Sequence, residues 1–328
     1  MKKTLKICFP TYNRCGAIVA RLNELFSKPL PENVSVLVID NNSTDDTYQR
    51  LSQIAREYQG LRVLQNPTNL GYAGNFFRLF DEADSDYLLI DSDEDEILVD
   101  QIPQFLDFLE IHTPSFVSPK ATVFDYTYRG AGKNGEIQPK DFRESSNYLS
   151  GITFEVSAAR KACTKAKQLI NKNAAAHVYP QVLVAAEMIC CGKALWYSKT
   201  LTLKRQQLQS YIKNPDGGAY YHLTGRYQQN IGFIDYLRGM ATENSANLKI
   251  VEAITDMLDA AEQRIFHDLR AGLSHERPDL LKSFDYAGRQ FYGMFGLLRR
   301  VSSKFGLALN EPERILPYVK KRLNSVRG

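Results

Sequence analysis

The sequence predicts an α/β domain with a mostly parallel sheet, followed by an all-helical C-terminal domain. Within residues 5–90, four short apolar runs alternate with three segments of helical periodicity. This alternation is typical of parallel strands joined by crossover helices. After the Pro- and Gly-bearing segment 214–218, strand-like runs stop and helical periodicity takes over. We therefore expect a first domain at 1–213 and a second at 214–328.

Each predicted element has a local signal. The run 34–39 is almost continuously apolar and β-branched, which is typical of a strand buried on both faces. The segment 16–27 carries apolar residues at the spacing of an amphipathic helix. The predicted strands are 5–9, 34–39, 61–65, 87–90 and 115–118, and the predicted helices are 16–27, 44–58, 70–83, 99–112, 220–240, 246–272, 278–301 and 311–326.

Composition excludes several classes of protein. The 328 residues are 44% hydrophobic and 24% charged, as in ordinary globular proteins, and the net charge of +4 is too small to indicate a nucleic-acid partner. The N-terminal apolar run is interrupted by Lys6 and Pro10, and no stretch is long enough to predict a transmembrane helix. The five cysteines have no metal-ligand spacing. We therefore expect a cytoplasmic protein.

Polar clusters follow three of the predicted strands, at 11–13, 40–43 and 91–93. Ligands of parallel sheets bind at the carboxyl ends of the strands, so these clusters predict one common site. The third cluster continues into 91–96, where five of six residues are acidic. Carboxylates this close repel one another unless a cation or solvent relieves them. This favours a divalent-metal site, with a solvated acidic loop as the alternative.

Four segments carry a resemblance to a known family: FPTYNR at 9–14, VIDNNSTD at 38–45, NLGYAGN at 69–75 and LIDSD at 89–93. Together they resemble glycosyltransferase family 2, which has the GT-A fold. The finer similarity is to the abequosyltransferase-like sugar transferases of O-antigen and capsule assembly. The resemblance implies a metal-dependent, inverting transfer of a sugar from a nucleoside-diphosphate donor to a glycan or polyprenyl-linked acceptor in bacterial surface polysaccharide synthesis.

The resemblance also implies residue roles. Asp40 would hydrogen-bond the base, and Asp91 and Asp93 would bind Mn²⁺ or Mg²⁺ beside the diphosphate. The expected nucleotide-sugar residues are Pro10, Thr11, Tyr12, Asn13, Asp40, Asn42, Asn69, Gly71, Asn75, Asp91 and Ser92. Tyr12 as a packing aromatic and Asn69 as a turn former are the alternatives. The chain departs from the family in having Asn41 where many relatives have a second acid. The metal pair is also ambiguous by two residues, because Asp93 and Asp95 repeat the spacing of Asp91 and Asp93.

The catalytic base is the weakest part of the pattern. An inverting transferase needs a group that removes the proton of the acceptor hydroxyl. Many family members carry an acidic pair where this chain reads AHVYPQ at 176–181, without an acid. We name His177 as the first candidate, Glu155 as the second and Asp125 as the third, with a purely structural histidine as the alternative. Lys204 and Arg205 are either diphosphate contacts or a solvated basic pair.

The C-terminal segment 289–328 is basic, with nine basic and two acidic residues and a net charge of +7. Its mixture of apolar and basic residues is typical of helices that bind an anionic membrane surface, with a solvated helix face as the alternative. Because acceptors in surface-glycan assembly are often lipid-linked, we expect peripheral attachment at the inner face of the cell membrane. Aromatic residues at 220–236 are expected in core or subunit contacts, so a homo-oligomer is a further expectation.

Two other functions remain open. A nucleotidyltransferase acting on sugar phosphates would need a Gly- and Arg-rich loop with a lysine near the N-terminus, and residues 10–14 do not supply one. A non-catalytic GT-A-like partner protein would keep the pocket and act through its helical domain. The missing acidic pair around His177 is the observation that favours it.

Overall fold

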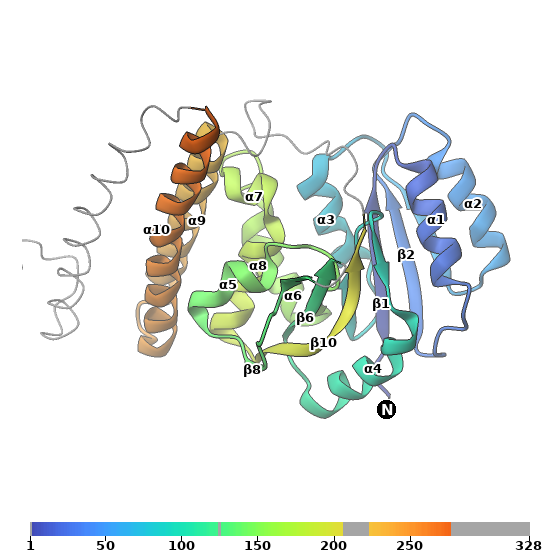
Figure 1. Cartoon of the computed structure of the whole chain (residues 1–328), viewed down its shortest axis with the longest axis horizontal. Coiled ribbons are helices and arrows are strands. Elements are labelled where there is room, and N and C mark those ends of the chain that lie inside the picture. Colours follow the sequence, from blue (N-terminus) through green and yellow to red (C-terminus); the bar gives the residue numbers. More distant parts are fainter. Residues whose placement is uncertain (1, 124–125, 206–222, 277–328) are drawn as a thin grey trace, which may run out of the picture. The chain divides into compact units, whose positions relative to one another are not determined.

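The computed structural model describes residues 2–123, 126–205 and 223–276 (Figure 1). The chain divides into two units, Met1–Arg264 and Ile265–Gly328. The first unit holds the sheet and the helices around it. Of the second unit the structure describes the end of one helix. The predicted domain boundary at 213/214 falls in the segment 206–222, outside the described residues.

The sheet has ten strands in the order β3-β2-β1-β4-β9-β6-β10-β5, with β7 paired to β6 and β8 to β10. Pairs among β3, β2, β1 and β4 are parallel, as is β6 with β10, whereas β9 is antiparallel to both β4 and β6. The strands are β1 (Leu5–Thr11), β2 (Val34–Asp40), β3 (Leu61–Gln65), β4 (Tyr87–Ile90), β5 (Asp95–Ile97), β6 (Phe116–Val123), β7 (Tyr126–Arg129), β8 (Gly135–Glu136), β9 (Thr153–Glu155) and β10 (Ala194–Lys204).

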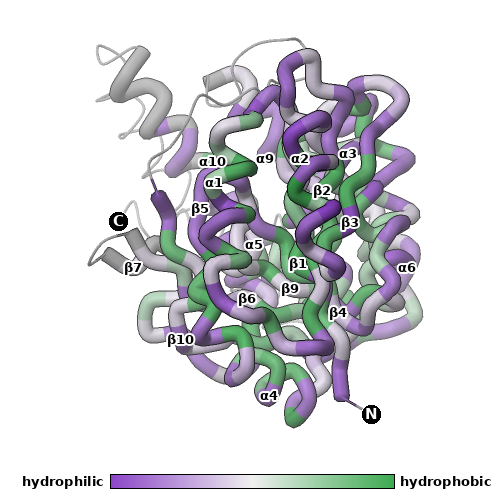
Figure 2. The backbone as a smooth tube through the Cα atoms, turned by 90° about the vertical axis from the view of Figure 1, so that its right-hand side faces the viewer, coloured by the Kyte–Doolittle hydropathy of each residue, from purple (hydrophilic) through white to green (hydrophobic). Residues whose placement is uncertain are grey.

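Helices cover both faces of the parallel part (Figure 1). They are α1 (Cys15–Leu25), α2 (Thr47–Glu57), α3 (Gly71–Glu82), α4 (Ile102–His112), α5 (Phe142–Ser146), α6 (Val156–Lys167), α7 (Ala174–Val178), α8 (Pro180–Cys191), α9 (Leu223–Glu243) and α10 (Leu248–Glu276), with 3₁₀ turns η1 (Val99–Gln101) and η2 (Pro139–Asp141). Alternate residues of β1, such as Ile7 and Phe9, join a core with Ile18 and Leu22 of α1. Figure 2 shows hydrophobic colour along these central strands.

The predicted fold class is confirmed: a mostly parallel sheet with helices is followed by a helical C-terminal region. The predicted strands at 61–65 and 87–90 have the observed bounds. The first strand is longer than predicted, because Pro10 and Thr11 continue the parallel ladder beside Ile39 and Asp40 instead of turning away. This extension carries the following polar residues to the same sheet edge as the end of β2.

The helical region begins with α9 and α10. Phe233 of α9 is fully buried and packs on Phe142 and Tyr179, so α9 is anchored to the rest of the first unit. In the part of the chain that the structure describes, no helix is long and apolar enough to cross a membrane. The predicted helices at 278–301 and 311–326, and the basic segment 289–328, lie outside the described residues.

Candidate functional site

A cleft of about 610 Å³ opens at the carboxyl ends of β1 and β4. One wall comes from the N-terminal parallel strands and their loops, and the other from α7, α8, the segment 147–150 and the helices α9 and α10. The lining residues are Pro10, Thr11, Tyr12, Arg14, Asn41, Asn69, Gly71, Tyr72, Asn75, Ser92, Asp93, Glu94, Asp95, Asn147, Tyr148, Leu149, Ser150, His177, Val178, Tyr179, Gln181, Lys204, Arg226 and Arg264. The cleft is therefore placed where the strand-end clusters predict a site.

Asp93 is the acid around which the first wall is built. Its side chain is only 6% exposed, and its Oδ2 accepts a hydrogen bond of 2.9 Å from Thr11 Oγ1. Arg14 Nη1 lies 3.4 Å from Asp93 Oδ1 and 2.5 Å from Glu94 Oε1. Burial raises the pKa of Asp93 to about 6, although the charge of Arg14 opposes the rise. The carboxyl group is therefore held in the cleft at a cost that the charge of Arg14 relieves only in part.

Asp91 and Asp95 lie on either side of this acid with different exposure to the cleft. Asp91 is fully buried and is absent from the cleft lining, and burial together with the charge of Asp95 raises its pKa well above the ordinary range. Asp95 lines the cleft and accepts hydrogen bonds from the hydroxyls of Tyr148 and Ser150. Asp93, the acid that the two predicted registers share, therefore lines the cleft, whereas Asp95 is held by the two hydroxyls.

Asp40 shapes the loop after β2. It is fully buried, its Oδ2 accepts bonds from Ser43 N at 3.1 Å and Gln65 Nε2 at 3.0 Å, and its Oδ1 accepts one from Ser43 Oγ. It does not line the cleft, because these partners hold its carboxylate inside the loop. Asn13 ties the same loop to β1, since its Oδ1 accepts a bond of 2.8 Å from Thr44 N. Asn42, with a φ of 61°, is also absent from the lining.

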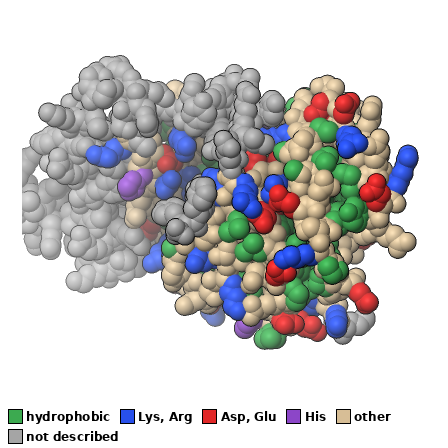
Figure 3. Space-filling model, turned by 45° about the vertical axis from the view of Figure 1, so that its right-hand side comes forward, with side chains coloured by type: hydrophobic (Ala, Val, Ile, Leu, Met, Phe, Trp, Pro, Cys, Tyr) green, Lys and Arg blue, Asp and Glu red, His purple; other side chains and the backbone are tan. Residues whose placement is uncertain are grey.

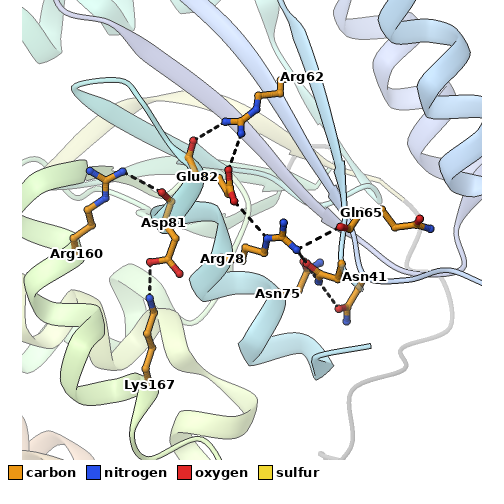
Figure 4. A network of polar contacts seen from close by, with 10 residues as sticks. Asn41, Arg62, Gln65, Asn75, Arg78, Asp81, Glu82, Arg160 and Lys167 are labelled. Carbon is orange, nitrogen blue, oxygen red and sulfur yellow. Dashed lines mark hydrogen bonds and ion pairs between the residues drawn. The ribbon is translucent and has the colours of Figure 1, made fainter. Parts of the chain in front are cut away.

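A buried amide network joins β2, β3 and α3 behind the wall (Figure 4). Asn41 Nδ2 donates to Asn69 Oδ1 at 2.8 Å and to Gly71 O at 3.2 Å, while its Oδ1 accepts from Asn66 Nδ2 at 2.7 Å and from Leu70 N at 2.9 Å. An asparagine is needed here because both donors and acceptors are used, which a carboxylate could not supply. The departure noted in the sequence thus holds the loop 69–71 at the cleft.

Asn75 and Arg78 extend this network. Asn75 accepts a bond of 3.0 Å from Asn66 Nδ2 and donates one of 3.1 Å to Ile39 O, which joins α3 to the end of β2. Arg78 lies between the network and Glu82 of the same helix, as Figure 4 shows. The N-terminal part of α3, which contributes Gly71 and Asn75 to the lining, is therefore fixed from behind.

His177 lies on the opposite wall, in the last turn of the short helix α7. Its Nδ1 is buried and has no hydrogen-bond partner among the described residues. Tyr72 of α3 reaches toward this wall, with its hydroxyl 3.4 Å from Gln181 Oε1 at the start of α8. The imidazole therefore has a nitrogen that no neighbouring described side chain engages.

Tyr148 is a cleft residue that the sequence did not single out. The guanidinium of Arg129 lies 5.7 Å and Lys204 Nζ lies 5.3 Å from the centre of its ring, and its hydroxyl donates to Asp95. Arg129 is 2% exposed and donates to the carbonyls of Tyr148 at 2.6 Å and Ser150 at 2.8 Å. The segment 147–150 reaches the site because β9 runs antiparallel beside β4. This pairing cannot be predicted from a local sequence pattern.

The other candidate bases are placed differently. Glu155 pairs with Tyr87 at the start of β4, the end away from the cleft, and its carboxylate accepts bonds from Ser157 N at 3.2 Å and Ala158 N at 2.6 Å as the N-cap of α6. Glu155 thus caps α6 and is absent from the cleft lining. Asp125 lies outside the described residues. Lys204 lines the cleft, whereas Arg205 pairs with Glu96.

Nine of the predicted site residues come together in the cleft: Pro10, Thr11, Tyr12, Asn69, Gly71, Asn75, Ser92, Asp93 and His177. Asp95, a member of the alternative metal pair, joins them, as do Arg14, Asn41, Glu94, Tyr148 and Gln181, to which the sequence assigned no role in the site. On the face seen in Figure 3, acidic and basic side chains are mixed. A smaller cavity of about 320 Å³ between 171–174 and α9 holds none of the predicted site residues.

The side chains that could coordinate a divalent cation in the cleft are carboxylates. Among the described residues, no three acidic, histidine or cysteine side chains gather as a metal site. Asp93 and Glu94 are adjacent carboxylates at the cleft surface, already bridged by one cationic group. Mg²⁺ is commonly bound through one or two carboxylates with phosphates and water completing its shell. The residues therefore fit a cation that is shared with a phosphate-bearing ligand.

Comparisons with known proteins agree with this geometry. The model of glycosyl transferase family 2 matches residues 6–166, which contain the first wall and the whole acidic segment. A search of the curated proteins found no match.

Among solved structures, S. aureus TarS has a TM-score of 0.57 at 14% identity, over 84% of this chain and 44% of that one. TarS 1-349 in complex with UDP-GlcNAc has a TM-score of 0.54 at 15% identity, over 88% and 92% of the two chains. The mannosyltransferase PcManGT from Pyrobaculum calidifontis, in complex with GDP-Man and Mn²⁺, has a TM-score of 0.52 at 12% identity, over 89% and 81%. At these identities the likeness shows a shared fold. The present chain spans less than half the length of the full TarS chain.

Proposed function

We propose that this chain, whose residues 6–166 match the model of glycosyl transferase family 2, transfers a sugar from a nucleoside-diphosphate donor to an acceptor hydroxyl with inversion at the anomeric carbon. The observation that carries the proposal is the pairing, across one cleft, of the acidic cluster at Asp93 with a histidine at the other wall. Structures similar in fold were solved with UDP-GlcNAc and with GDP-Man and Mn²⁺, which supports a donor of this class.

The first wall would hold the donor. Thr11 and Tyr12 at the end of β1, with Asn69 and Gly71 before α3, present polar and aromatic surface to a nucleoside and its sugar. Asp40 would act on the base indirectly, through the loop that it holds. The amide network behind this wall keeps its loops in place before the donor arrives, which reduces the ordering cost of binding.

Asp93, with Glu94 beside it, would hold a divalent cation against the diphosphate, and Asp95 would support the segment from the inside. When bound, Mn²⁺ or Mg²⁺ supplies positive charge that stabilises a departing nucleoside diphosphate. The predicted pair of Asp91 and Asp93 is replaced in this proposal, because the buried carboxylate of Asp91 does not reach the cleft lining.

His177 would act as the general base. Its imidazole accepts the proton of the acceptor hydroxyl while that oxygen attacks the anomeric carbon and the bond from this carbon to the diphosphate oxygen breaks. A single displacement of this kind inverts the configuration and needs the base on the acceptor side of the cleft. His177 is proposed for this role because it lines the same cleft as Asp93 and its Nδ1 has no hydrogen-bond partner among the described residues.

Turnover is the direct test of this assignment. Purified protein would be incubated with a panel of nucleotide sugars, Mn²⁺ and glycan or polyprenyl-phosphate-linked acceptors, and the release of nucleoside diphosphate measured. We expect release with one donor class, and product of inverted configuration by NMR. Retained configuration would contradict the inverting mechanism. Donor binding without release for every acceptor would favour the non-catalytic partner protein instead.

The acceptor and the cellular setting follow the family resemblance. We propose a glycan or lipid-linked acceptor in surface polysaccharide synthesis, with the basic segment 289–328 attaching the enzyme to an anionic membrane surface. Co-sedimentation with vesicles containing phosphatidylglycerol, at low salt, would compare the full chain with a chain ending at residue 288. Equal binding of the two chains would refute the attachment.

A further inference from the structure

Arg14 is a cleft residue to which the proposed function has so far given no role. Its guanidinium bridges two carboxylates of consecutive residues, with Nη1 at 3.4 Å from Asp93 Oδ1 and 2.5 Å from Glu94 Oε1. The side chain is 14% exposed and lines the cleft. The other oxygen of Asp93 is taken by Thr11 at 2.9 Å. The Asp93 oxygen that Thr11 does not engage therefore faces the guanidinium, together with one oxygen of Glu94.

One cation at this position excludes another. A divalent ion held between Asp93 and Glu94 would lie next to the positive charge of Arg14, and repulsion between them is stronger than in bulk water because these three side chains are at most 20% exposed. Arg14 must then leave the carboxylates or give up part of its contact. Its backbone stays fixed, because Arg14 O accepts a bond of 3.0 Å from Ile18 N in the first turn of α1, so the movement falls on the side chain.

The donor offers Arg14 a new partner. A diphosphate carries oxygens that match the planar fork of a guanidinium, which binds phosphate through two parallel hydrogen bonds. Because the diphosphate must lie at the cation, it also lies within the part of the cleft that Arg14 lines. Arg14 would then pair with the carboxylates in the ligand-free protein and with the diphosphate when the donor is bound, so its guanidinium would be paired in both states.

We infer that Arg14 occupies the cation position of the ligand-free protein and passes to the donor's diphosphate when the divalent ion binds. This inference rests on the proposed function for its second half. It makes Arg14 a positioning residue that couples the cation to the donor, so that the metal binds weakly alone and tightly with a nucleoside diphosphate. The metal site is thereby closed until a donor is present.

One substitution of Arg14 is expected to change two affinities in opposite directions. In Arg14→Ala, binding of Mn²⁺ alone, measured by calorimetry, is expected to tighten about tenfold, because the competing charge is gone. Binding of UDP and GDP in saturating Mn²⁺ is expected to weaken about tenfold, because the diphosphate loses a charge-assisted partner. Arg14→Gln, which lacks the charge but keeps a polar side chain, should shift both affinities in the same directions and serves if the alanine variant does not fold.

Arg50→Ala is the matched control. Arg50 is exposed on α2, where it donates to Gln53 at 2.8 Å, and its removal changes the net charge equally without touching the acids. Equal Mn²⁺ affinity in the Arg14 and Arg50 variants, or nucleotide affinity unchanged from wild type, would overturn the inference. Absence of UDP and GDP binding in the wild type would contradict the proposed function instead, and the Mn²⁺ titration would then decide alone whether Arg14 holds the cation position.

Discussion

The two walls of the cleft are built in different ways. The wall from β1, β2 and β4 comes from segments that each follow a strand directly, and a buried amide network fixes its loops. The opposite wall is gathered from α7, α8, the segment 147–150 and the helices α9 and α10, which are far apart in the sequence. The loops of the first wall are therefore held rigidly, and their residues can be predicted from the local sequence. The position of the second wall depends on how elements far apart in the sequence pack together. In the proposed function, the first wall binds the donor and the second carries the acceptor chemistry.

Among the substitutions considered, Asp93→Asn in the first wall should have the largest effect on nucleotide binding. The variant keeps the shape of the side chain and its contact with Thr11 but removes the charge that would hold the cation. We expect Mn²⁺-dependent nucleotide affinity to fall about 100-fold or more, with the fold intact by circular dichroism. Asp86→Asn is the matched control, because Asp86 binds Thr4 and Lys3 away from the cleft. Unchanged affinity in Asp93→Asn would remove the metal assignment.

His177→Ala should impair the function proposed for the second wall and leave that of the first wall intact. Loss of a general base lowers turnover by roughly 10²- to 10⁴-fold, whereas donor affinity should change by no more than about twofold. Turnover and calorimetry on the same preparation separate the two effects. His112→Ala, at the end of α4 and away from the cleft, is the control. Full activity of His177→Ala would require another base on this wall.

Asn41→Asp measures how much the amide network contributes to stability and to donor binding. A carboxylate cannot donate to Asn69 Oδ1 and Gly71 O, so two hydrogen bonds become repulsive contacts in a buried site. We expect a loss of about 2–3 kcal/mol in the free energy of unfolding and a donor affinity roughly tenfold lower. Asn33→Asp, whose amide donates to Lys3 O away from the cleft, makes the same chemical change as a control. A donor affinity equal to that of the control would show that the loop 69–71 does not depend on Asn41.

Asp93 also makes a prediction about pH and stability. Its pKa is raised from 3.8 to about 6 in the folded protein, so between these values the folded state binds more protons than the unfolded state. The free energy of unfolding should therefore fall as pH rises from about 4 to 6, by at most about 3 kcal/mol from this group. Urea denaturation of wild type and Asp93→Asn without metal should show the larger fall in the wild type. Parallel pH profiles would contradict the raised pKa.

The smallest expected effect is that of Tyr148→Phe. The substitution removes the hydroxyl that donates to Asp95 but keeps the ring beneath Lys204 and Arg129. One hydrogen bond to a carboxylate contributes about 1.5–3 kcal/mol, and Ser150 continues to hold Asp95, so we expect only a several-fold fall in turnover. Tyr58→Phe, in a stacked pair with Phe26, is the control. An effect as large as that of His177→Ala would place Tyr148 in the chemistry itself.

The contrast between the walls explains what the sequence could predict. Thr11 and Asp93 were found because each closely follows a predicted strand and parallel strands bring their carboxyl ends to one edge, whereas Asn69 was named from the family resemblance. Asn41 was noticed only as a departure, because its role depends on partners in three other segments. The buried position of Asp91 depends on how the chain turns after β4, which spacing alone does not fix.

The second wall shows the limit of local patterns. Tyr148 and Ser150 reach Asp95 only because β9 inserts antiparallel between β4 and β6. Glu155, named as a base on its type and approximate place in the chain, lies at the far end of the same short strand and caps α6. His177 was named because acids are missing around it, and its place in the cleft comes from the packing of α7 against α3 and α9.

In the proposed function, the first wall holds the donor through a cation at Asp93. The most direct test is a calorimetric titration of UDP and GDP into the wild type and Asp93→Asn, with and without Mn²⁺. We predict that one of the two nucleotides binds the wild type only when Mn²⁺ is present, and that Asp93→Asn binds neither under any condition. Equal binding by both proteins, or binding that is indifferent to Mn²⁺, would contradict the account.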